Sequence, residues 1–591
     1  MSVKRSLFTL AGVFCALALV ADASAGKKGK STDWDDDAEK ELPPLELHGY
    51  LRFRGELFHN YDLGYTDQRS FQFGKLTSFF TPFSERNPNR DIPGLSPSQA
   101  TASNVGADTQ GFATMRFRLE PTINVTEDIR IKAQIDIFDN MVLGSTPEGF
   151  PNPSGFAPII AFTPGAVPPS DGTNALKDSI RVKRAWGEVV TPFGMLAFGR
   201  MGSHWGMGLL ANDGNCMDCD YGDTWDRVMF VTKVAGHIIA PFMDFASEGL
   251  TSDVYQMTQA YVRGATGLGS SAVVDRYQGR PFDLDQRDDV NQYGIAILKK
   301  DSPKEIKEKL ENGETVINYG LYALFRNQAW TTENRSYFTN SSNGSSAFQG
   351  RPDQPDLYRQ PLFERRVARA WIMDPWFKLM RKKMVLEMEA AFIIGSIDEN
   401  INGQQLDIMQ WGAVLRFSDK YLNDTISVAF EAGIASGADG RGLGIRDSVL
   451  VAPERGSGQV ASATNFKFDP DYQVDRILFR EIVGSVTDAW YLKPTFQYNV
   501  TESFGVKAAL IYSHAMNHRQ WPGGTADASG NRPGGALGLE MNFDIFYKLE
   551  DFLYASIGYA GLFPFAGLQD ATTNVVPTYA QSIFTRLIIR Y

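Results

Sequence analysis

The sequence predicts an all-β chain that closes into a transmembrane antiparallel up-and-down β-barrel of about 18 strands. Apolar and polar residues alternate over stretches of about 10 to 13 residues. An average soluble strand has about six residues, and a tilted strand that crosses a bilayer has about 9 to 11. Short links alternate with long polar ones. No stretch after the first 25 residues approaches the roughly 18 uninterrupted apolar residues of a membrane-spanning helix.

The N-terminus has the features of a secretory signal peptide. Lys4 and Arg5 precede an apolar run over residues 7–20, and small residues follow at 23–25, which is the order of a cleavable signal. We therefore expect export through the Sec pathway. The domain prediction is a signal peptide at 1–25, a disordered periplasmic N-terminal segment at 26–44, and the barrel at 45–591.

The first strands show the alternation most clearly. In 45–58, Leu51 and Phe53 face one side while Arg52 and Arg54 face the other, because successive side chains of a strand point to opposite faces. Residues 112–125 and 129–139 alternate in the same way on either side of the letters NVTE, which recur at 499–502. The repeat predicts two hairpins of the same design.

The remaining strands follow the same pattern. They are predicted at 179–190, 195–207, 226–234, 237–245, 290–300, 315–328, 367–380, 384–397, 407–417, 425–437, 488–500, 504–516, 535–548, 552–563 and 579–591. Tight links are expected at 126–128, 191–194, 381–383 and 549–551, and long polar segments at 59–110, 140–178, 246–289, 329–365 and 438–472. Residues 302–313 predict one short helix, with a capping box of Ser302 and Glu305.

Two parts of the chain carry a family resemblance. The final strand ends on Tyr591 and resembles the closing strand of outer-membrane barrels, whose terminal aromatic residue is the signal that the barrel assembly machinery recognises. The phrases RAWGEVVTPFGMLAFGR (184–200) and SHWGMG (203–208) resemble porins of the eighteen-stranded alginate-export type and an uncharacterised family of predicted outer-membrane proteins. The resemblance implies location in the outer membrane of a Gram-negative cell, in contact with its lipids.

Charge placement suggests what the interior does. Strand 18 must neighbour strand 1 in a closed barrel, so inward basic residues would form one continuous wall: Arg52, Arg54, Arg116, Arg118, Arg130, Lys132, Arg586 and Arg590. Inward carboxylates on later strands would form an opposing acidic wall: Glu387, Glu389, Glu431, Glu540 and Asp544. Walls of opposite sign set a transverse field in a wet pore and favour anions near the basic side.

An alternative interpretation of the same residues is structural. The basic side chains could pair with neighbouring carboxylates at Glu46, Glu56, Glu120 and Asp136 and simply stiffen a partly filled barrel. The formal net charge of −11 makes nucleic acid an unexpected partner.

The stretch NDGNCMDCDYGDTWDR (212–227) permits three readings. A disulfide between Cys216 and Cys219 is expected in an exported protein, whereas five nearby aspartates argue against a redox-active thiol. The aspartates could hold Ca²⁺, but an acidic solvated rim is favoured. His514 and His518 lie four apart, which is metal spacing on a helix, yet here a strand is ending, so no metal site is expected.

The sequence therefore predicts a porin-like channel for passive diffusion of small polar or anionic solutes. The alternatives are a polysaccharide-export barrel, a surface or assembly scaffold whose lumen is occluded by loops such as 59–110, and an outer-membrane hydrolase. No signature places a histidine beside a nucleophile, so no enzyme, catalytic residue or cofactor is expected.

Overall fold

The computed structural model describes most of the chain between its long polar segments. The described residues are 43–61, 63–64, 109–143, 180–247, 290–333, 362–398, 405–437, 462–517, 521, 533–569 and 576–591. The predicted signal peptide, residues 26–42 of the predicted N-terminal segment, most of 59–110 and His518 lie outside them. No helix within the described residues has the length and apolar character needed to cross a membrane.

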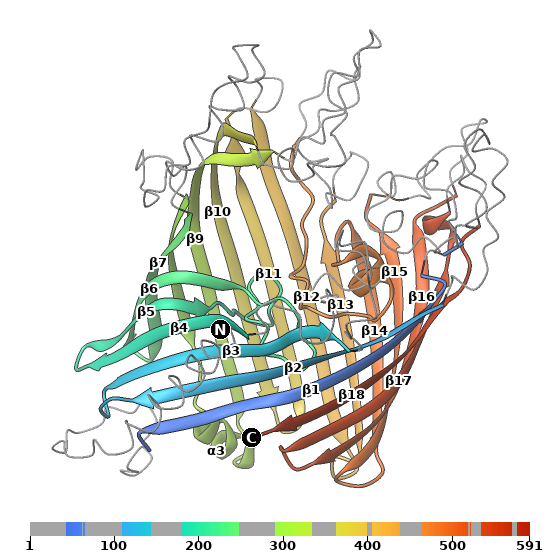
Figure 1. The fold of residues 1–591 in the computed structure, drawn as a ribbon, viewed down its shortest axis with the longest axis horizontal. Coiled ribbons are helices and arrows are strands. Elements are labelled where there is room, and N and C mark those ends of the chain that lie inside the picture. Colours follow the sequence, from blue (N-terminus) through green and yellow to red (C-terminus); the bar gives the residue numbers. More distant parts are fainter. Residues whose placement is uncertain are drawn as a thin grey trace, which may run out of the picture.

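The strands form one closed antiparallel sheet, the predicted barrel (Figure 1). Each strand pairs with the next along the chain, and β1 pairs with both β2 and β18. The strands are β1 (Leu45–His59), β2 (Thr109–Asn124), β3 (Ile129–Val142), β4 (Ile180–Thr191), β5 (Gly194–Gly202), β6 (Thr224–Val234), β7 (His237–Ser247), β8 (Val290–Lys299), β9 (Thr315–Glu333), β10 (Leu362–Arg381), β11 (Met384–Ile397), β12 (Leu406–Tyr421), β13 (Ile426–Ala435), β14 (Ala489–Asn499), β15 (Phe504–Ala515), β16 (Ala536–Leu549), β17 (Leu553–Pro564) and β18 (Ala580–Arg590). The 18-stranded sheet confirms the predicted fold class and strand number.

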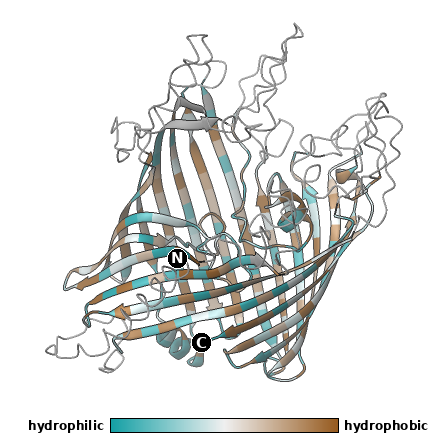
Figure 2. Cartoon of the chain, viewed as in Figure 1, coloured by the Kyte–Doolittle hydropathy of each residue, from teal (hydrophilic) through white to brown (hydrophobic). Residues whose placement is uncertain are grey.

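The two faces of the barrel wall differ as the alternation predicts. On β1, Leu51 and Phe53 are 43% and 39% exposed, while Arg52 and Arg54, which alternate with them, are fully buried. Figure 2 shows the same alternation of hydrophobic and hydrophilic residues along the strands. A closed sheet leaves no unpaired edge, and an apolar exterior suits hydrocarbon, so this wall meets the requirements of a membrane-spanning barrel.

The repeated NVTE letters close two equivalent turns. In the first, the hydroxyl of Thr126 accepts a hydrogen bond from the backbone N–H of Ile129 at 3.0 Å. In the second, the hydroxyl of Thr501 accepts one from the N–H of Phe504 at 2.9 Å. The repeat is therefore local turn chemistry.

The predicted short helix is also present. It is α3 (Pro303–Glu311), with proline in its first turn. Ser302 and Glu305 form the reciprocal capping box, which satisfies two backbone donors that a helix start leaves free. The helix forms most of the link between β8 and β9.

The main departure from the prediction lies inside the barrel. β5 ends at Gly202 instead of 207, and residues 203–223 leave the wall and enter the lumen. Residues 463–488, between β13 and β14, enter the lumen from another part of the wall at the same end of the barrel. They include a helical turn over Leu478–Val483. We call these the first and second lumenal segments, and together the lumenal insert.

The insert is anchored by an apolar core. Leu209 of the first segment packs in one cluster with Phe466, Phe468 and Phe479 of the second. The same cluster includes inward side chains of the wall, such as Tyr491 on β14. Gly412 on β12 allows this packing, because a β-carbon there would collide with the ring of Phe466. The insert is therefore a folded body inside the barrel.

Candidate functional site

Five inward arginines gather on three adjacent strands, and they form the arginine patch. They are Arg52, Arg54, Arg116, Arg118 and Arg586, and each is less than 10% exposed. Arg52 lies opposite Arg116 in the sheet register, and Arg54 lies opposite Arg586. Like charges placed directly across a strand pair destabilise a sheet. The patch therefore requires counter-charges.

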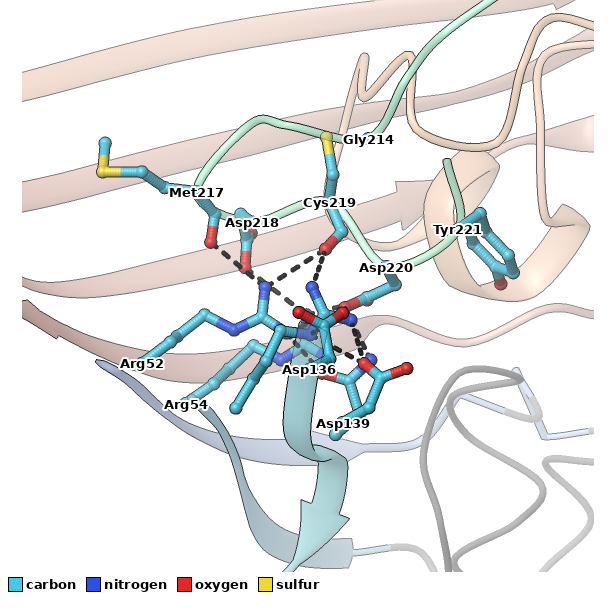
Figure 3. Close-up of polar contacts among 12 residues, drawn as sticks. Arg52, Arg54, Asp136, Asp139, Gly214, Met217, Asp218, Cys219, Asp220 and Tyr221 are labelled. Atoms are coloured by element: carbon cyan, nitrogen blue, oxygen red, sulfur yellow. Dashed lines mark hydrogen bonds and ion pairs between the residues drawn. The ribbon is translucent and has the colours of Figure 1, made fainter. Parts of the chain in front are cut away.

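The first lumenal segment supplies two of them (Figure 3). The carboxylate of Asp220 lies 3.1 Å from Arg52 and 2.8 Å from Arg54. The carboxylate of Asp218 lies 2.7 Å from Arg586. Burial alone would raise the pKa of both aspartates, but the surrounding guanidinium groups hold each pKa far below its usual value. Both carboxylates therefore remain charged over the physiological pH range.

Backbone carbonyls of the same segment complete the contact. Arg52 donates to the carbonyls of Met217 at 3.1 Å and Cys219 at 3.2 Å, and Arg116 donates to Cys219 at 2.9 Å. Cys216 and Cys219 form a disulfide across this turn. The disulfide restricts the short loop whose carbonyls face the arginines.

Part of the patch is paired within the wall. Arg118 makes a two-point contact with Asp136 at 2.7 and 2.8 Å, and Arg586 donates to Glu56 at 2.9 Å. The other two carboxylates considered from sequence contact amides: Glu46 accepts from Asn124, and Glu120 accepts from Gln134. Local pairing thus accounts for part of the charge balance, and the insert accounts for much of the rest.

The other predicted basic residues lie outside the patch. Arg130 is half-buried, and Lys132 pairs with Glu188 at 3.1 Å. Arg590 is exposed at the end of β18. Tyr591 donates to the carbonyl of Arg118 at 2.9 Å, which ties the terminal residue to β2.

Three of the five predicted acidic residues, Glu389, Glu540 and Asp544, anchor the insert to the wall, and the other two pair within the wall. Glu389 on β11 accepts from the backbone N–H groups of Met207 and Leu209. Glu540 on β16 accepts from the N–H groups of Arg476, Ile477 and Leu478. Two further acidic residues hold cations: Asp544 contacts Arg476 at 2.9 Å, and Glu431 contacts Arg416 at 2.7 Å. Glu387 pairs with Lys378 at 3.3 Å.

The two lumenal segments are joined to each other by charged groups. Asp471 accepts from the backbone N–H groups of Asp220, Tyr221 and Gly222 at 2.8 to 3.0 Å, and Arg480 contacts Asp218 at 2.7 Å. Burial and the neighbouring carboxylate of Asp223 raise the pKa of Asp469 to about 8. At neutral pH, Asp469 is therefore mostly protonated.

The favoured interpretation of 212–227 as an acidic solvated rim is wrong. Asp218 and Asp220 face the arginine patch inside the barrel, with side-chain exposures of 24% and 10%. Only Asp226, on β6, makes an exposed pair, with Arg200. Within the described ranges, no three His, Cys, Asp or Glu side chains are placed to hold a metal ion, and His514 stacks on Trp490.

Sequence reasoning missed several charged residues of the lumen. Arg476 and Arg480 belong to the second lumenal segment, which lacks the alternation that marks inward residues on a strand. Lys493 on β14 and Lys507 on β15 could have been found, because they alternate with the outward Leu492 and Leu510.

Comparisons with known proteins find similarity at the level of structure. No family model matches the chain, and no curated protein matches it. OccAB2 of Acinetobacter baumannii is 8% identical with a TM-score of 0.41, and the match covers 92% of this chain and 98% of OccAB2. OccK9 (OpdG) of Pseudomonas aeruginosa is 11% identical with a TM-score of 0.41, and the match covers 92% of this chain and 99% of OccK9. A BenF-like porin from Pseudomonas fluorescens Pf-5 is 9% identical with a TM-score of 0.39, and the match covers 93% of this chain and 98% of that porin. Similarity at this level assigns neither a family nor a substrate to the chain.

Proposed function

We propose that this chain is an outer-membrane channel through which small polar or anionic solutes diffuse passively. The observation that carries the proposal is the contrast between the two faces of one closed barrel. The outside is apolar, while charged side chains on the inside remain in contact with solvent: Arg416 has a side-chain exposure of 42%, and Lys507 is exposed. Solvated charges in the lumen of a closed barrel are what an aqueous pathway requires.

The lumenal insert would act as the constriction of this channel. It contacts β1, β2 and β18 through ion pairs and β11, β12 and β16 through hydrogen bonds and apolar packing. Solutes would pass beside a fixed body lined with charge on both sides. In this proposal, the arginine patch holds the constriction in place as well as shaping the field in the pore.

Export through the Sec pathway, insertion by the barrel assembly machinery through Tyr591, and residence among outer-membrane lipids belong to the same proposal. An apolar exterior would be unstable in water, so such a chain must reach a membrane before its barrel is exposed. The folded insert inside the lumen leads us to favour small solutes over a polysaccharide.

Planar-bilayer recording tests the proposal. The refolded mature chain should give discrete ion-current steps, and reversal potentials in a salt gradient should show a preference for anions. Folding is checked in parallel by a strand-dominated circular-dichroism spectrum. A correctly folded barrel that gives no steps would contradict the channel.

The apolar packing of the insert favours a second candidate, a scaffold with an occluded lumen. Phe466, Phe468 and Phe479 are each about 1% exposed, so the insert is held firmly on one side. A folded barrel that is silent as the wild type and conducts once residues 463–488 are shortened would favour the scaffold over the channel, because it would show that the insert closes the lumen.

A further inference from the structure

Two lysines in the lumen have no ionic partner within the described part of the chain. Lys493 on β14 and Lys507 on β15 both point inward, because Leu492, directly before Lys493, and Leu510, three residues after Lys507, face outward with exposures of 38% and 45%. Lys493 is half-buried and Lys507 is exposed. Lys507 lies near the tight β14–β15 turn at 500–503, and Lys493 lies near the middle of β14.

The carboxylates nearest to these lysines are occupied by other groups. Glu431 lies across the sheet from Lys493, but its oxygens accept from Arg416 at 2.7 Å and from the hydroxyl of Tyr491 at 2.8 Å. Asp544 lies across from Lys507, but it contacts Arg476 at 2.9 Å. Each carboxylate is thus hydrogen-bonded or ion-paired to an arginine and acts on the lysine across from it only electrostatically, so the positive charge of the two lysines is only partly compensated.

The carboxylates of the second lumenal segment and of β16 are also engaged. Asp475 acts electrostatically on Lys493, but its oxygens accept from the backbone N–H groups of Phe479 and Arg480. Glu540 accepts from three backbone N–H groups of the same segment. Neither makes an ion pair with the two lysines in the described part of the chain.

Polar side chains surround the lysines on the inward face. Gln497 lies directly across from Lys507, and Thr495 lies between Gln497 and Lys493 on the same face of β14. Both are half-buried. The amide nitrogen of Gln497 donates one hydrogen bond to Asn499 at 2.9 Å. Its second N–H and the hydroxyl of Thr495 can donate to an oxyanion that the two ammonium groups attract.

We propose that Lys493 and Lys507, with Gln497 and Thr495, form an anion-binding site in the channel for small solutes that carry carboxylate or phosphate groups. The site lies on β14 and β15, apart from the arginine patch on β18, β1 and β2, whose charge is compensated by Asp218, Asp220 and Asp136. Anions are therefore attracted to the β14–β15 wall, on the side of the barrel where the sequence alone predicted an acidic wall. This inference deepens the proposed channel function and rests on it.

Current block by added anions tests the site. Inorganic phosphate and succinate are titrated separately into a chloride solution while single channels are recorded. Both anions should reduce the current in a concentration-dependent way. Because a hydrogen bond to a charged group contributes about 1.5–3 kcal/mol, each of Lys493→Gln and Lys507→Gln should raise the half-blocking concentration about tenfold or more. Comparing the phosphate titration with the succinate titration distinguishes phosphate-bearing from carboxylate-bearing solutes.

Two other lumenal lysines serve as matched controls. Lys132 and Lys378 each have a side-chain exposure of 30%, and each pairs with a glutamate, at 3.1 and 3.3 Å. Lys132→Gln and Lys378→Gln remove the same unit charge, but should change the half-blocking concentration less than about twofold, the scatter expected of a weak exposed pair. Equal effects from all four variants, or no block in the wild-type channel, would overturn the site.

Calorimetric titration of phosphate and succinate into the detergent-solubilised protein separates the site from conduction. Binding that is lost in the Lys493→Gln and Lys507→Gln double variant, in a barrel that gives no current steps, would support the site while contradicting the channel. Current steps without any measurable binding would support the channel while contradicting the site.

Discussion

Replacing Asp220 with asparagine removes the counter-charge at the centre of the arginine patch. Its carboxylate contacts Arg52 at 3.1 Å and Arg54 at 2.8 Å, and both guanidinium side chains have an exposure of 0%. Arg54 keeps Asp218 at 3.5 Å as a second partner. Arg52 has no other ion pair among the described residues, and keeps only an amide and two carbonyls.

The size of the effect follows from this burial. Removing one partner from a buried ion pair costs about 3–5 kcal/mol, because the remaining charge stays buried without compensation. Asp220 takes no part in the backbone pairing of β1 with β2 and β18, so we expect most of the cost to fall on docking of the first lumenal segment. A loss of about 3 kcal/mol raises the undocked population by about two powers of ten. Current noise from an unstable constriction should increase accordingly.

Single-channel recording and limited proteolysis measure this change. We expect Asp220→Asn to show frequent transitions to a higher conductance and faster cleavage within residues 212–223. Asp226→Asn is the matched control from the same acidic stretch, because its pair with Arg200 has side-chain exposures of 45% and 57% and contributes about 0–1 kcal/mol. If Asp220→Asn behaves like Asp226→Asn, the arginine patch does not hold the constriction.

Three further changes test other parts of the structure. Glu389→Gln keeps only one oxygen for two backbone donors and should loosen the first lumenal segment by about 1–3 kcal/mol, seen as faster cleavage near residue 207; unchanged cleavage would contradict this anchor. The pKa of Asp469 is raised from its ordinary value of 3.8 to about 8 in the docked state. Because the docked state holds this proton more tightly than the undocked state, docking of the lumenal segments should weaken as the pH rises from about 4 to about 8. Asp469→Asn should remove this dependence, and noise that still rises with pH would refute it. Leu510→Arg on the lipid face should cost about 2–4 kcal/mol of refolding stability near the bilayer midplane, whereas Gln497→Arg in the lumen should cost far less; equal losses would place the membrane elsewhere.

The barrel could be predicted from the sequence because a membrane imposes two simple rules. Every backbone group must be paired, and each strand must show one face to lipid and the other to the lumen. These rules fix the period of two, which located all 18 strands and placed Arg52, Arg54, Arg116, Arg118 and Arg586 on one inward face. The pairing of β1 with β2 and with β18 then places these five arginines side by side.

The lumenal insert could not be predicted in the same way, because no period marks a loop that turns inward. The aspartates of 212–227 suggest a solvated loop when they are considered alone. Charge balance was the available signal: five buried arginines face only a few wall carboxylates, such as Glu56 and Asp136, so counter-charges had to come from a loop. The apolar residues of 474–486 were a second signal, since they are too hydrophobic for a segment in water.

The turn at 217–220 is held mainly by charge, and residues 466–483 are held mainly by apolar packing. This difference determines where the insert can loosen first. Toward β12 and β14, Phe466 and Phe479 pack in an apolar core, which tolerates no gradual loosening because lost contacts leave cavities. Toward β1 and β18, Asp218 and Asp220 hold the insert through charge. Charged contacts exchange readily with water or with permeating ions once they are exposed. Any widening of the pathway should therefore begin beside the arginine patch, with the second lumenal segment remaining fixed to the opposite wall.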